Sequence, residues 1–162
     1  MIRNLREIGP YLQKIVTRLQ SNQNLLKYLY YTDKDPLANQ NLSKKQIQEE
    51  IFNELIKIVP RVGPKETAKS LISIRVVNGH QNDANNQIED LSVAIEVFVP
   101  MTQWIIKDEN LRPFCIMGEI QNSLNGKNID GLGRVHGGDF AANFFTDEIS
   151  CYEMTYSFSL YD

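Results

Sequence analysis

Apolar residues recur at helical spacing through the first third of the chain. Pro10 suits the first turn of a helix, and an apolar stripe follows it, so we predict an amphipathic helix over residues 10–20. The stripe consists of Leu12, Ile15, Val16 and Leu19. A second, short helix is predicted by Leu25, Leu26 and Leu29. Ser43 and Gln46 have the spacing of a capping box, ahead of a third apolar stripe. That stripe consists of Ile47, Ile51, Phe52 and Leu55.

A period of two replaces the helical period from Leu71 onward, and such alternation predicts half-buried strands. In the first strand, one face is shared by Ile72, Ile74 and Val76. In the second, one face is shared by Leu91, Val93, Ile95, Val97 and Val99. A later strand alternates in the same way through Tyr152, Met154, Tyr156, Phe158 and Leu160. The polar stretch 78–90 separates the first two strands, so we predict a hairpin with a long, mobile tip.

The region between these strands contains one more helix. Pro113 begins it, Asn125 and Gly126 end it, and its apolar face consists of Met117, Ile120 and Leu124. The glycine-rich run 131–138, GLGRVHGG, predicts a flexible turn region, and 140–145 is either a short strand or a packed loop. The order of elements predicts one α+β domain over residues 1–162, with an antiparallel sheet of about four strands flanked by helices.

Composition places the chain among globular proteins and limits its chemistry. Of 162 residues, 42% are hydrophobic and 23% are charged, and the apolar runs are too short to span a membrane. The beginning of the chain lacks the apolar core of a secretory signal. Cys115 and Cys151 are expected to be buried free thiols, which favours a reducing compartment.

Charge is divided unevenly along the chain. Residues 1–66 hold 11 Lys and Arg against 7 Asp and Glu, a balance of +4, and residues 67–162 hold 6 against 13, a balance of −7. The sum of −3 argues against a nucleic-acid-binding protein. Two interpretations remain open: chance segregation on a solvated surface, or opposite charges that meet between neighbouring subunits of a head-to-tail ring.

The candidates for catalytic or metal-binding groups are few. His80 with Asp83, and His136 with Asp139, have a spacing that matches no established metal-ligand motif, so we expect no metal. The run 131–138 lacks the Gly-Lys-Ser/Thr of a phosphate-binding loop, so we expect no nucleotide and no other cofactor. No arrangement of nucleophile and base is evident. The protein is therefore expected not to be an enzyme, with a small enzyme using His136 and Asp139 as the alternative.

The order of features resembles the tail terminator proteins of long-tailed bacteriophages, also called tail completion or head–tail joining proteins. The resemblance extends over nearly the whole chain. It rests on LLKYLYYTDKDPL after the first helix, on IVPRV, and on two strands flanking a polar loop. It continues with Trp104 shortly after the second strand, with Arg112 opening a helix, with SLNGKNIDGLG at the end of that helix, and with a tyrosine-rich last strand.

This resemblance implies a structural subunit of the virion, assembled in the host cytoplasm. Such subunits form a ring, usually hexameric, that caps the tail tube, meets the connector of the neck, and lets DNA pass through its lumen without binding it specifically. Neither a membrane nor a catalytic residue is implied. Another neck or baseplate adaptor of similar fold is the alternative. Loops 78–90 and 126–138, with Trp104, are the expected contact regions. The expected contact residues are Asn82, Asp83, Asn85, Trp104, Arg134 and His136.

Overall fold

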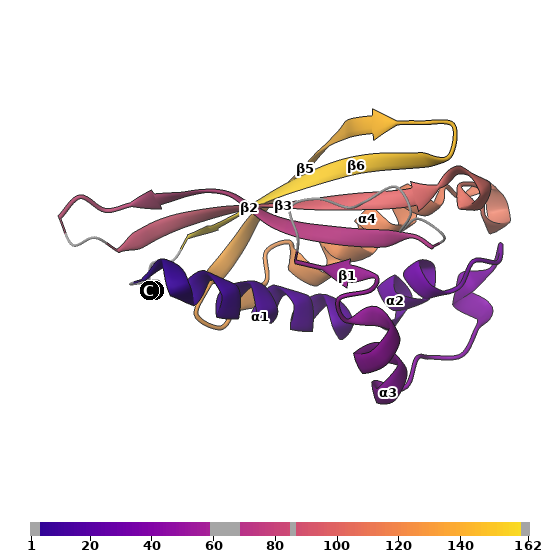
Figure 1. Cartoon of the computed structure of the whole chain (residues 1–162), viewed down its shortest axis with the longest axis horizontal. Coiled ribbons are helices and arrows are strands. Elements are labelled where there is room, and N and C mark those ends of the chain that lie inside the picture. Colours follow the sequence, from indigo (N-terminus) through magenta and orange to yellow (C-terminus); the bar gives the residue numbers. More distant parts are fainter. Residues whose placement is uncertain (1–3, 59–68, 85–86, 160–162) are drawn as a thin grey trace.

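The computed structural model describes residues 4–58, 69–84 and 87–159, and the described residues form a six-stranded sheet flanked by helices (Figure 1). The strands lie in the order β1-β2-β3-β6-β5-β4. Their bounds are β1 Ile56–Lys57, β2 Leu71–Gln81, β3 Ile88–Pro100, β4 Asn128–Ile129, β5 Gly133–Phe145 and β6 Ile149–Ser159. The helices are α1 Ile8–Gln20, α2 Gln23–Tyr30, α3 Lys44–Gln46 and α4 Arg112–Leu124. Short 3-10 turns occupy Leu5–Glu7, Pro36–Ala38, Met101–Gln103 and Lys107–Glu109.

The α+β class is confirmed, but the sheet is larger than predicted and is mixed. Strands β1 and β2 pair in parallel, while every other pairing is antiparallel. The additional strands were hard to recognise for physical reasons. β1 and β4 have two residues each, too few to show alternation, and much of β5 is exposed on both faces.

The predicted helices form with one exception. α1 begins at Ile8, two residues before Pro10, and α2 covers the second apolar stripe. The capping box is present, because Ser43 and Gln46 each bond the other's backbone. The third helix is shorter than predicted: α3 passes into a π-helical turn at Ile47–Ile51, and Phe52 is already extended.

The hairpin between β2 and β3 is longer, and its loop shorter, than predicted. Gln81 pairs with Ile88, so most of 78–90 is strand, and residues 85 and 86 of the turn lie outside the described residues. Two register shifts, between Val76 and Asn78 and between His80 and Gln81, interrupt the ladder. The outer end of the hairpin is largely solvated on both faces. Its residues are therefore polar, and their sequence resembles that of a loop. Figure 1 shows that the hairpin projects beyond the helices.

The glycine-rich run 131–138 is also more regular than predicted. From Gly133 onward the run is the first part of β5. Residues 140–145 continue the same strand, so this segment is a strand and not a packed loop. The glycines allow a bulge between Gly137 and Asp139. Gly137 has a φ of +113°, and a Cβ there would lie 2.6 Å from the carbonyl oxygen of Thr155. Both the positive φ and the lack of space for a Cβ therefore favour glycine at this position.

β6 lies between β3 and β5, at the centre of the sheet. Its register pairs Met154 with Ile95, Tyr156 with Val93, and Phe158 with Leu91, so the predicted apolar face is confirmed for these residues. Tyr152 is half-buried, and Leu160, Tyr161 and Asp162 lie outside the described residues. The opposing helix α4 supplies Met117, Ile120 and Leu124 to the same core.

Both cysteines are free thiols. Cys151 is buried as predicted, while Cys115 is half-buried. Within the described residues, no helix is long and apolar enough to cross a membrane.

Candidate interaction surface

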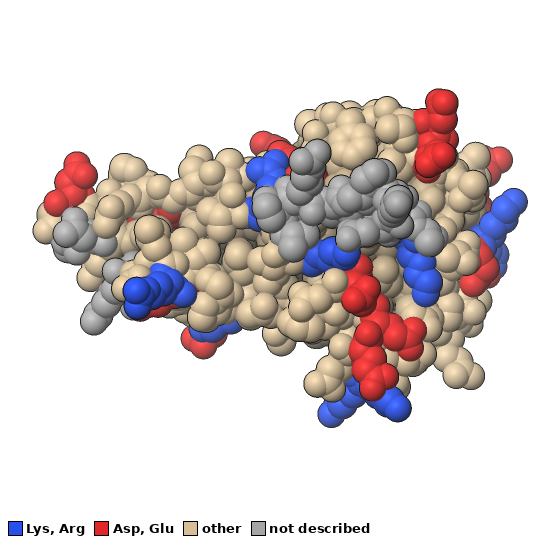
Figure 2. Space-filling model, viewed as in Figure 1, with Lys and Arg blue, Asp and Glu red and all other residues tan. Residues whose placement is uncertain are grey.

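Three phenylalanines of β5 are exposed. Phe140 is 57% exposed, Phe144 42% and Phe145 48%, although each is large and apolar. In Figure 2 the end of the molecule that holds β5 and β6, at the upper right, presents mainly uncharged atoms. An exposed group of aromatic side chains on a folded domain often marks a site of protein association.

Two of these rings belong to an aromatic cluster. The cluster consists of Trp104, Phe114, Phe140, Phe145 and Tyr152. Tyr152 is its centre, with ring centroids 5.2 Å from Phe114, 5.4 Å from Phe145 and 6.4 Å from Phe140. Trp104 lies 6.4 Å from Phe145 and donates a hydrogen bond of 2.7 Å from Nε1 to Ser150 Oγ. That bond and its partial burial fix the Trp104 ring, so one side of the cluster is held in place.

A bulge in β5 explains why Phe140 and Phe145 share this cluster. Residues five apart in a regular strand face opposite sides of a sheet. The register shift between Ala142 and Phe144 changes that parity, so Phe140 and Phe145 both approach Tyr152. Phe144 then faces the other side of the sheet, beside Phe98 at 6.0 Å. β5 therefore presents apolar rings on both of its faces.

The outer edge of β5 is open over much of its length. Val135 still has partners there: its N–H donates to the Lys127 carbonyl and its own carbonyl accepts from Gly126 N–H. From residue 136 to 145, within the described part of the chain, β5 pairs with β6 alone. We call this stretch the β5 edge. An open edge beside exposed aromatic rings is a template for another strand.

The charge around the β5 edge is negative. Asp139, Asp147 and Glu148 are exposed, and every charged residue from His136 to Ile149 is acidic. Such a surface repels phosphates. It therefore fits a protein partner better than a nucleic acid.

The structure separates the contact residues that the sequence predicted. Trp104 lies in the aromatic cluster. Arg134 and His136 lie near the start of β5, where they pair with Asn128 and Ser157. Asn82 and Asp83 lie in the hairpin turn, and the Asn82 side chain bonds to Glu89. Asn85 lies outside the described residues.

The other members of the aromatic cluster were not predicted from the sequence. Phe140 and Phe145 belong to the run FAANFF, whose bulge hides the alternation, while Phe114 and Tyr152 come from α4 and β6. The available signal was three phenylalanines in six residues, in a segment that shows no buried face. Among the described residues, no group of three His, Cys, Asp or Glu side chains could hold a metal ion.

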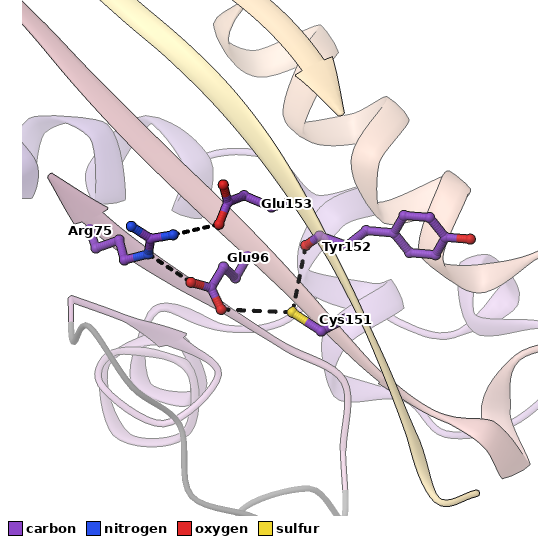
Figure 3. A network of polar contacts seen from close by, with 5 residues as sticks. All are labelled: Arg75, Glu96, Cys151, Tyr152 and Glu153. Atoms are coloured by element: carbon purple, nitrogen blue, oxygen red, sulfur yellow. Dashed lines mark hydrogen bonds and ion pairs between the residues drawn. The ribbon is translucent and has the colours of Figure 1, made fainter. Parts of the chain in front are cut away.

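The other face of the sheet carries an ion-pair network that joins three strands (Figure 3). Arg75 on β2 contacts Glu96 on β3 at 2.7 Å and Glu153 on β6 at 2.5 Å. Cys151 Sγ lies 3.7 Å from Glu96 Oε2. Burial, followed by the nearby Glu96 carboxylate, raises the pKa of Cys151 to about 12. This thiol is therefore protonated and unreactive at neutral pH, and the network holds the strands together.

Arg112 fixes the loops behind the aromatic cluster. Its side chain is fully buried, and its guanidinium group donates to backbone carbonyls over 2.6–2.9 Å. The acceptors belong to Tyr28, Tyr31, Asp33 and Gln103. Tyr28 lies in the last turn of α2, where a positive charge stabilises the exposed carbonyls. Arg112 thus joins the end of α2 to the turn that precedes Trp104.

Comparison with known proteins identifies a family. No curated protein matches the chain. The model of the YomW family matches residues 22–158, which include α2, α4, most of the sheet and every member of the aromatic cluster. The chain therefore belongs to the YomW family, a family of phage-derived proteins.

Proposed function

We propose that the protein is a structural subunit of a phage tail, and that several copies, six in the expected case, form a closed ring that caps the tail tube and joins it to the connector of the neck. The observation that carries this proposal is the β5 edge with its exposed phenylalanines. Membership of a phage-derived family supports a role in the phage particle.

The mechanism is geometric. A ring forms when one surface of each copy binds a different surface of the next copy and the rotation closes. The subunit offers two such surfaces: the β5 edge, and the β2–β3 hairpin that projects beyond the helices (Figure 1). The two faces of the ring then meet the tail tube and the connector, and DNA passes through the lumen without specific contacts.

A neck or baseplate adaptor of similar fold is the second candidate, because both kinds of protein need the same two surfaces. A small enzyme with His136 and Asp139 is less well supported. Both side chains are exposed on β5.

Deletion of the gene from a phage that carries it tests the proposal. We expect heads and tails that remain unjoined in electron micrographs, and joined particles after the wild-type gene is supplied in trans. Tails longer than normal would identify the tail terminator, since an uncapped tube continues to add subunits. Normal joined particles after deletion, or a reconstruction that contains one isolated copy or a two-fold dimer, would refute the ring.

A further inference from the structure

We infer that the β5 edge of one copy pairs with the open edge of β2 in a second copy, so that the two sheets continue as one antiparallel sheet. The inference rests on the head-to-tail association in the proposed function, but not on a position in the tail. It names the strands that form the interface between subunits.

Strand directions make this pairing antiparallel. β3 is antiparallel to both β2 and β6, and β6 is antiparallel to β5. β2 and β6 therefore run one way, and β3 and β5 run the other way. When a second copy lies beside the first in the same orientation, its β2 runs opposite to β5. The new pair then has the geometry of the other antiparallel pairs in the sheet.

Both edges are open at the same level of the sheet. Among the described residues, β2 pairs on its outer side only with β1, at Ile72 and Ser73, so the strand from residue 74 to 80 is open there. Through β6 and β3, the register aligns His136 with Asn78 and Asp139 with Arg75. Neighbouring copies can therefore pair with little shift along the strands. A larger shift would engage more of both edges.

Apolar contact and charge favour this pairing. Val77 is 47% exposed on β2, and Phe140 is exposed on the β5 edge, so both add exposed apolar surface to the contact between copies. From Leu55 to Ile58 and from Lys69 to Gln81, the charged residues are Lys57, Lys69 and Arg75, all basic. Arg75 is engaged by Glu96 and Glu153, so the attraction between charges depends on Lys57 and Lys69. The β5 edge and the turn after it are acidic. A symmetric β5–β5 contact would instead bring two Asp139 side chains together.

Disulfide cross-linking tests the register. Asn78→Cys is combined in one chain with His136→Cys, the two positions that the register aligns, and Val77→Cys is combined with Asp139→Cys or Ala141→Cys to detect a shifted register. The concentrated purified protein, and particles that contain it, are oxidised and run on non-reducing gels. We expect at least one double variant to give a covalent ladder that ends at the number of subunits in the ring, and each single variant to give no more dimer than wild type.

Surface variants provide the matched control. In the cross-linking background, Phe140→Lys should reduce the ladder more than tenfold, because it places a charge in the apolar contact. Leu37→Lys, at another exposed apolar residue, in the Pro36–Ala38 turn, should leave the ladder unchanged. Circular dichroism checks that both variants are folded.

Two results would overturn the inference. One is the absence of a ladder from every double variant, in the purified protein and in particles alike. The other is a dimer formed by Ala141→Cys alone, which indicates a two-fold β5–β5 contact. Particles that contain the protein in a ring without these cross-links would leave the proposed function intact and refute only the strand pairing.

Discussion

At the scale of single residues, Arg112 shows how a buried charge organises loops that the sequence does not connect. Its acceptors at and after the end of α2 lie 79–84 residues before it in the chain, whereas Gln103, in the Met101–Gln103 turn, lies only 9 residues before it. Burial lowers the pKa of Arg112, and the hydrogen bonds to carbonyl oxygens compensate for that burial. Removal of the guanidinium group leaves these carbonyls enclosed and without donors.

We therefore expect Arg112→Met to lower the free energy of unfolding by about 3–5 kcal/mol, as for the loss of one partner from a buried ionic group. Urea denaturation measures the change. Arg134→Met is the control, because Arg134 is exposed on β5 and its loss should cost less than about 0.5 kcal/mol. Equal stability of the two variants would contradict the role given to Arg112.

Buried ionisable groups also predict a dependence on alkaline pH. Burial raises the pKa of Cys151 from 9.0, and that of Tyr28 from 10.0, to about 12 in each case. The folded state therefore holds these protons more tightly than the unfolded state. The stabilisation is fully present below pH 9 and is lost as the pH rises toward about 12, because the unfolded state binds fewer protons in that window.

The measurement is urea denaturation at several pH values between about 8 and 10.5. We expect the free energy of unfolding to fall with pH, by up to about 1.4 kcal/mol per pH unit for each group that titrates in the unfolded state alone. Cys151→Ala should reduce the slope. Constant stability across this range would show that the thiol and the phenol ionise alike in both states.

At the scale of elements, β6 is the strand that joins the two halves of the sheet. Phe158 is fully buried on its helix-facing side, opposite Leu91 on β3 and Val135 on β5. Phe158→Ala should lower the free energy of unfolding by about 3–5 kcal/mol, the range for a deleted buried aromatic side chain. Thermal or urea denaturation measures this change in the free energy of unfolding. The exposed counterpart Phe144→Ala should change stability much less, and wild-type stability of Phe158→Ala would contradict the packing of β6.

The elements that could be predicted are those with one buried face. Helices α1, α2 and α4, and the inner parts of β2, β3 and β6, alternate with the period of their secondary structure because one side meets the core. β5 and the outer half of the hairpin are solvated on both sides. Their polar residues and glycines therefore led to the prediction of loops instead of strands. Because β5 lacks a buried face, most of the interaction surface could not be predicted from the alternation of apolar residues. The sequence predicted Trp104 of the aromatic cluster and His136 at the start of the β5 edge, but none of the phenylalanines.

At the scale of the whole molecule, charge and shape are both asymmetric. Lys57 and Lys69, near β1 and β2, and the acidic edge near β5 lie toward opposite ends of the strand order. If these two regions meet between copies, salt weakens their attraction, because the screening length falls from about 10 Å at 0.1 M to about 3 Å at 1 M ionic strength.

We therefore expect association of the purified chain, measured by sedimentation, to weaken as sodium chloride rises over that range. The double variant Asp139→Asn and Asp147→Asn should associate more weakly at low salt and depend less on salt. Association that strengthens with salt in the wild type would show that apolar contact outweighs charge at the interface.

The central position of β6 also constrains how the protein is made. A ribosome completes β3 and β5 before it completes β6, yet β6 lies between them. From residue 136 onward β5 therefore has no neighbour in the sheet while it emerges, and its phenylalanines are exposed on a nascent chain. Translation that pauses before Ile149 would prolong this exposure, so a chaperone that binds aromatic segments during synthesis would have its main target here.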